Sequence, residues 1–87
     1  MTKITPEDGV RRQFHSRAVI ESMCVRIVRD QVACRDVKRV VIRRLHPQGT
    51  GPNWEVERFE PPLSTAAEDI ALRIIKRLQD QVALGKA

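Results

Sequence analysis

Apolar and charged residues alternate in the middle of the chain in a pattern that is typical of β-strands. β-branched and aromatic residues gather at residues 37–45 and again at residues 54–60. Between these segments, two prolines, two glycines and an asparagine fall within seven residues, which is turn chemistry. The pattern therefore predicts a β-hairpin with strands at about residues 37–45 and 54–60.

The side-chain period of a strand also predicts how the two strands pair. If Ile42 faces Val56, the hairpin has an apolar face and a charged face, which hold respectively Val40, Ile42, Trp54 and Val56, and Arg39, Arg43, Glu55 and Glu57. A register slipped by one residue would place Arg43 beside Val56. Because opposite charges stabilise directly opposed positions, the register that pairs Ile42 with Val56 is favoured.

The segment before the hairpin has helical features from residue 6 to residue 33. Thr5 can cap a helix that starts at Pro6, and two acidic residues follow in the first turn. Further on, apolar residues fall in one arc at helical spacing, namely Ile20, Met23, Cys24, Ile27 and Val28. We predict a helix over about residues 6–33, with a possible break near His15 because Ser16 offers a second cap. A strand over residues 23–29 is the competing interpretation.

The last part of the chain has the clearest helical periodicity. Two prolines at residues 61–62 end the hairpin, and Ser64 or Thr65 can cap the helix that follows. The apolar arc contains Ala67, Ile70, Ala71, Ile74, Ile75, Leu78 and Val82. Because Gly85 occupies a position typical of a C-terminal cap, we predict a helix over about residues 65–84.

These elements predict one small α+β domain over residues 1–87, in the order helix, strand, strand, helix. Both helices are expected on the apolar face of the antiparallel hairpin. Two strands alone are marginally stable and leave unpaired edges, so either residues 3–5 form a third strand or a second chain completes the sheet. We predict a homodimer, formed by edge pairing or by helix packing.

Composition places the protein among soluble folded proteins. The 87 residues are 41% hydrophobic and 31% charged, with a formal net charge of +5. No apolar run approaches the length of a membrane span and residues 1–10 lack the apolar centre of a signal peptide, so we expect a cytoplasmic protein without a membrane partner. Cys24 and Cys34 lie ten residues apart without a neighbouring ligand pair, which indicates reduced thiols and no metal site.

Positive charge is concentrated in the first part of the chain, where residues 1–52 hold eleven Lys and Arg against five Asp and Glu. One cluster around the first strand comprises Arg35, Lys38, Arg39, Arg43 and Arg44. It is dense enough to attract phosphate groups, although the glutamates of the second strand can neutralise it. If the first helix is continuous, a second basic stripe comprises Arg11, His15, Ser22, Arg26 and Arg29. The solvated face of an ordinary amphipathic helix is its alternative interpretation.

No stretch of the sequence carries a catalytic or cofactor-binding signature. Neither His15 nor His46 has spaced carboxylates or thiols for acid–base chemistry, and the glycines at 49 and 51 precede a strand rather than a phosphate-binding helix. We therefore expect a non-enzymatic protein-interaction or assembly module without cofactors, homodimeric and with an unidentified protein partner. The alternative is a basic nucleic-acid-binding accessory protein that contacts its ligand or an acidic partner through Arg35, Lys38, Arg39, Arg43, Arg44, Arg26 and Arg29. Sequence-specific RNA binding is disfavoured because three aromatic residues offer few stacking surfaces.

Overall fold

A computed structural model describes residues 12–46, 49 and 51–85, and it has an α+β fold. The elements follow the order β1 (Gln13–His15), α2 (Arg17–Val28), a 3-10 turn η1 (Val32–Cys34), β2 (Arg39–Arg44), β3 (Trp54–Glu60), α3 (Thr65–Gln81) and β4 (Val82–Leu84). β2 and β3 are antiparallel, whereas β1 and β4 form a separate parallel pair. The expected α+β class, with two helices and an antiparallel strand pair, is therefore confirmed.

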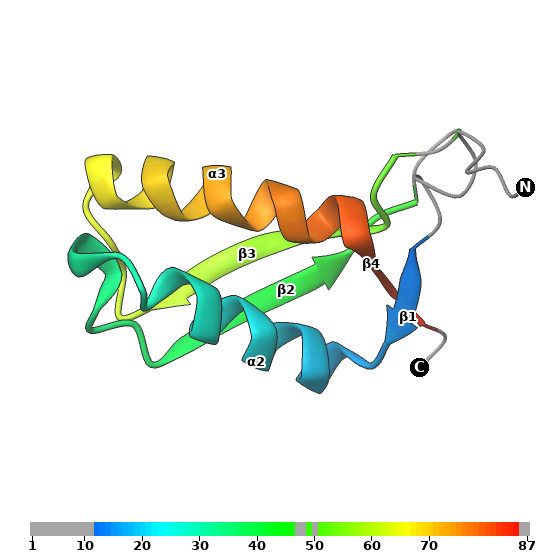
Figure 1. Ribbon diagram of the computed structural model, residues 1–87, viewed down its shortest axis with the longest axis horizontal. Coiled ribbons are helices and arrows are strands. Elements are labelled where there is room, and N and C mark those ends of the chain that lie inside the picture. Colours follow the sequence, from blue (N-terminus) through cyan, green and yellow to red (C-terminus); the bar gives the residue numbers. More distant parts are fainter. Residues whose placement is uncertain (1–11, 47–48, 50, 86–87) are drawn as a thin grey trace, which may run out of the picture.

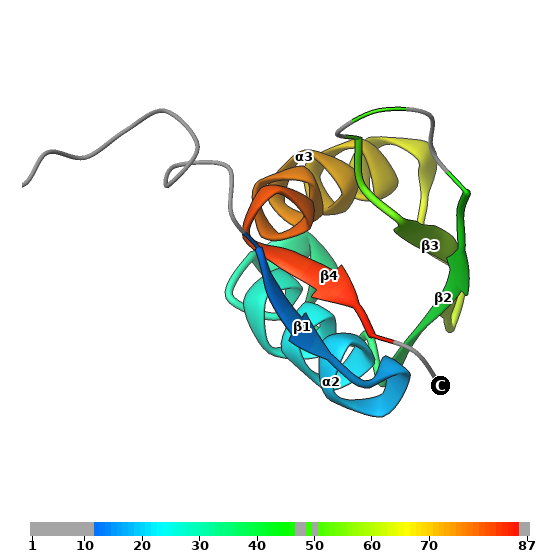
Figure 2. The same ribbon diagram turned by 90° about the vertical axis from the view of Figure 1, so that its right-hand side faces the viewer.

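The two helices lie on the same side of the β2–β3 hairpin, and the β1–β4 pair crosses one end of the molecule (Figures 1 and 2). Each helix begins at a serine whose hydroxyl accepts a backbone N–H, from Val19 to Ser16 and from Ala67 to Ser64. Buried residues recur at every fourth position of both helices and meet the apolar face of the hairpin. The largest buried side chains are those of Trp54, Ile20, Ile42 and Ile75.

The hairpin has the predicted register at its centre, where Ile42 lies opposite Val56 and Arg43 lies opposite Glu55. A β-bulge between Val41 and Ile42 then shifts the pairing by one residue. Beyond it, Arg39 faces Glu60, and Phe59 turns towards the core, where it is 4% exposed. The sequence carries a sign of this shift that the prediction did not use, because Phe59 lies three residues after Val56 and so falls out of the period of two that Trp54 and Val56 follow.

The predicted first helix differs from the observed structure. Residues 13–15 form β1, and α2 begins only at Arg17, after the cap at Ser16. The helix ends at Val28, short of the predicted residue 33, because a 3-10 turn replaces its last residues. The strand alternative for residues 23–29 is wrong as well, since residues 23–28 are helical. The predicted part before residue 12, and the third strand suggested at residues 3–5, lie outside the described residues.

The last helix also ends earlier than predicted. Its C-cap is Val82, whose backbone is extended at φ −130° and ψ 137°, and Val82–Leu84 pairs in parallel with β1. Gly85 therefore follows a strand instead of capping a helix. On the side of β4 that faces away from β1, the side chain of Asn53 binds the backbone of Leu84. Its amide oxygen accepts from the Leu84 N–H and its amide nitrogen donates to the Leu84 carbonyl, both at 2.8 Å.

Candidate nucleic-acid interface

An open groove of about 590 Å³ lies between α2 and β2, and it gathers basic residues from two separate segments of the chain. Its lining consists of Glu21, Ser22, Val25, Arg26, Arg29, Lys38, Arg39 and Val40. Residues 22, 26 and 29 fall on one side of α2 because their spacing follows the helical period. Lys38 and Arg39 enter from the beginning of β2, so the groove joins part of each basic stretch that the sequence indicates.

Charge in this groove is strongly unbalanced. Four of its lining residues are cationic and one, Glu21, is acidic. Arg26, Arg29 and Lys38 are exposed and form no ion pair with any residue of the described chain. Arg39 lies 3.8 Å from Glu60, an exposed contact that solvent weakens. The groove therefore presents three exposed cations that have no ion-pair partner among the described residues.

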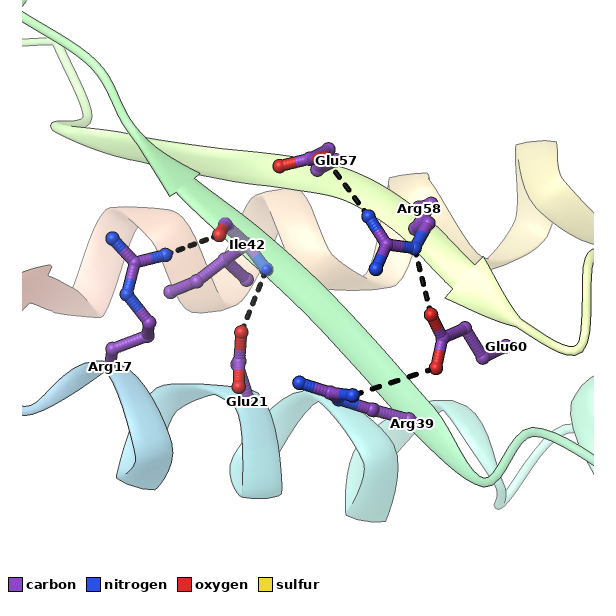
Figure 3. A network of polar contacts seen from close by, with 7 residues as sticks. All are labelled: Arg17, Glu21, Arg39, Ile42, Glu57, Arg58 and Glu60. Carbon is purple, nitrogen blue, oxygen red and sulfur yellow. Dashed lines mark hydrogen bonds and ion pairs between the residues drawn. The ribbon is translucent and has the colours of Figure 1, made fainter.

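Glu21 has a structural partner at one end of the groove. Its carboxylate accepts a hydrogen bond from the Ile42 N–H at 3.0 Å, and Arg17, one helical turn earlier, donates to the Ile42 carbonyl (Figure 3). These two side chains occupy the outward backbone groups of β2 where another strand would otherwise pair. The sequence gives no sign of this contact, because Glu21 and Ile42 come together only in the folded chain.

The remaining basic residues of the predicted set lie elsewhere. Arg43 lies on the outer face of the hairpin, where its Nε donates to Glu55 at 2.6 Å. Arg44 points to the opposite face and donates to the Gly85 carbonyl, so it helps to hold the end of the chain. Arg35 is exposed directly after η1 and does not line the groove. Four of the predicted seven residues thus line the groove, while Arg43 lies on the outer face of the hairpin, Arg44 on its core side and Arg35 at the end of η1.

An ion-pair network covers the outer face of β3, and the sequence analysis missed its central residue. Arg58 donates to Glu60 at 2.8 Å and to Glu57 at 2.9 Å, and Glu60 also approaches Arg39 (Figure 3). The hydrogen bond from Arg58 lowers the pKa of Glu60 below its ordinary value of 4.5. The sequence could have indicated this network, because an arginine at position 58 has glutamates at positions 57 and 60 of the same strand. This face is nearly self-neutralised, in contrast to the groove.

The histidines and cysteines do not assemble into a site. His46 is exposed beside the hairpin loop, and His15 lies on β1, away from the helical stripe in which the sequence placed it. Arg11, the first residue of that stripe, is outside the described residues. Cys24 and Cys34 are fully buried free thiols, and burial raises the pKa of Cys24 to about 12. Among the described residues no group of three metal-ligating side chains occurs.

Comparisons of the chain with protein-family models, with curated proteins and with solved structures found no match. Neither helix of the described chain combines the length and the apolar composition that crossing a bilayer requires.

Proposed function

We propose that this protein is a non-enzymatic binding module that holds nucleic acid in the groove between α2 and β2. The observation that carries the proposal is the gathering of Arg26, Arg29, Lys38 and Arg39 around one open groove. Cations placed in this way attract phosphate groups, and the release of counterions from nucleic acid adds to the affinity. The groove thus favours the nucleic-acid alternative over the protein partner that the sequence analysis puts first.

The electrostatic repulsion among the groove cations in the free protein supports the same proposal. Exposed arginines on the outer face of the hairpin are paired with glutamates, as Arg43 is with Glu55 and Arg58 with Glu57 and Glu60. In the groove, by contrast, like charges face one another and repel. A bound polyanion would offset that repulsion, whereas a purely solvated surface gains nothing from it.

A fluorescence anisotropy titration with a labelled nucleic-acid duplex tests the proposal. The double variant Arg26→Ala/Arg29→Ala removes two cations of the groove and should weaken binding at low salt at least tenfold. The matched control is Arg73→Ala/Arg77→Ala, which removes the same charge from exposed positions of α3. Equal weakening by both double variants, or no anisotropy change with the unmodified protein, would refute a site in the groove.

A second candidate function, assembly through a protein surface, rests on a neighbouring surface of α2 that shares Ser22 and Arg26 with the nucleic-acid groove. A smaller groove of about 360 Å³ is lined there by Ala18, Val19, Ser22, Met23 and Arg26, and Val19 is 41% exposed. We propose that the protein forms a homodimer through this helix surface rather than through a strand edge. The edges support this choice because Glu21 and Arg17 cap β2 at Ile42, and Gln79 donates to the Trp54 carbonyl of β3 at 2.6 Å.

Light scattering tests the assembly proposal at protein concentrations of tens of micromolar. The unmodified protein should have the mass of a dimer, and Val19→Glu should shift it to a monomer without loss of helical content. A monomeric mass for the unmodified protein would contradict the proposal. We also propose a cytoplasmic location, which the free and buried thiols of Cys24 and Cys34 support.

A further inference from the structure

We infer that the groove between α2 and β2 recognises the sugar–phosphate backbone of a nucleic-acid duplex and does not read its bases. The inference rests on the proposed function and adds to it the form of nucleic acid and the mode of recognition. Three features of the structure support it: the position of the aromatic residues, the length of the basic arc and the chemistry of the lining side chains.

The chain offers no stacking surface beside the groove. Proteins that bind single strands stack successive bases on aromatic side chains, and each stacked base contributes about 1–3 kcal/mol. Trp54 and Phe59 are buried in the core, at 0% and 4% exposure. Phe14 is exposed, but it lies on β1 before the first turn of α2, whereas the basic residues lie in its last turns and beyond. Within the described chain, single-stranded bases would thus find no aromatic partner in the groove.

The length of the basic arc fits the spacing of phosphates along a duplex. Ser22 and Arg29 are seven residues apart on one side of α2, which corresponds to about 10 Å along the helix axis. Each nucleotide of a duplex strand carries one phosphate, so a backbone lying along the groove presents consecutive phosphates to it. Four cations are available on the two walls to contact these phosphates.

The lining side chains bind phosphate readily but are poorly arranged to distinguish bases. Base recognition in a duplex requires a helix or strand pair inside the major groove, with side chains that reach the base edges. Here the cations lie in a concave surface between two elements, so a convex ridge such as a phosphate backbone can enter, while the base edges stay beyond it. The carboxylate of Glu21 repels phosphate at the end of the groove nearest Ile42, which directs the backbone towards Arg29 and Lys38.

The test compares the affinities of the full-length protein for several labelled ligands at about 50 mM salt. Two duplexes of equal length, one rich in A·T and one rich in G·C, should bind within threefold of each other. A non-pairing single strand of the same length should bind about tenfold more weakly. The exponent of the salt dependence is about 0.9 per phosphate contact for a duplex and about 0.7 for a single strand, and over four contacts at about 50 mM salt this difference amounts to about tenfold in affinity. Polyglutamate, a polyanion without phosphates, should bind more weakly than either duplex.

Several results would overturn the inference. They are tighter binding of the single strand, a difference above tenfold between the two duplexes, and tighter binding of polyglutamate. The first two results leave the proposed function intact if binding still depends on Arg26 and Arg29 and not on Arg73 and Arg77. The polyglutamate result with the same dependence would instead assign the groove to an acidic protein. Absence of binding to every ligand would refute both the inference and the proposed function.

Discussion

Replacing Asn53 by alanine should destabilise the fold because this side chain satisfies two buried backbone groups of β4. Its amide oxygen accepts from the Leu84 N–H and its amide nitrogen donates to the Leu84 carbonyl, each at 2.8 Å. Leu84 is 2% exposed. A buried polar group without a partner costs about 1–3 kcal/mol, and Asn53 itself is half-buried, so some water can replace it. We expect Asn53→Ala to lower the free energy of unfolding by about 2–4 kcal/mol.

Urea unfolding monitored by tryptophan fluorescence measures this effect, because the single tryptophan reports on the same region. The Trp54 indole donates to the Val82 carbonyl of β4 at 2.9 Å. Amide hydrogen exchange should show faster exchange at residues 82–84 in the variant. His46→Ala, at the other end of the hairpin loop and exposed, is the matched control and should change stability by less than about 0.5 kcal/mol. A loss below that value in Asn53→Ala would show that its two hydrogen bonds do not hold β4.

Three further predictions concern ionisable groups. The lowered pKa of Glu60 contributes stability above about pH 4.5, which is lost as the pH falls through the lowered value. Glu60→Gln should therefore flatten the acid limb of urea unfolding, and an unchanged acid limb would contradict the role of the Arg58 hydrogen bond. Because burial raises the pKa of Cys24 to about 12, its thiol should react with Ellman's reagent only after unfolding, and fast native reaction would contradict its burial. Glu21→Gln keeps an oxygen for the Ile42 N–H and removes a charge that repels phosphate. Its affinity for duplex at low salt should rise severalfold, and an unchanged affinity would place the ligand away from Glu21.

Local pattern in the sequence was sufficient to predict the centre of the hairpin. The strand over residues 54–60 has the predicted bounds, and Ile42 faces Val56 as expected. Both predictions depend on residues that are close in the chain, where the period of two and the paired charges act together. The bulge opposite Val41 and Ile42 was not predicted, although Phe59 stands out of phase with Trp54 and Val56 and was the available signal.

The ends of the chain could not be predicted in the same way. β1 and β4 have three residues each, which is too short for a period to be recognised, and each adjoins a segment with helical periodicity. Val82 continues the apolar arc of α3, but it is extended because β4 pairs with β1 and accepts hydrogen bonds from the side chains of Trp54 and Asn53. Tertiary contacts between segments about 70 residues apart therefore override the local helical preference.

The candidate site was predictable only in part. The sequence identified Arg26 and Arg29 in one stripe and Lys38 and Arg39 in another, but their meeting in one groove depends on how α2 lies against β2. The sequence could have separated Arg44 from the groove residues, because residues 42 and 44 of a strand point to the same face and Ile42 was expected on the apolar face. Its side chain accordingly lies on the core side of the hairpin, where it contacts the Gly85 carbonyl.

The salt dependence of duplex binding tests the central claim most directly, because it counts the phosphates that the groove neutralises. With four cations engaged, the logarithm of the association constant should fall against the logarithm of salt with a slope of about −3.6, a loss of about 150-fold between 50 and 200 mM. Arg26→Ala/Arg29→Ala should halve the slope to about −1.8, while Arg73→Ala/Arg77→Ala leaves it unchanged. A slope that is the same in all three proteins would contradict the assignment of the groove as the binding site.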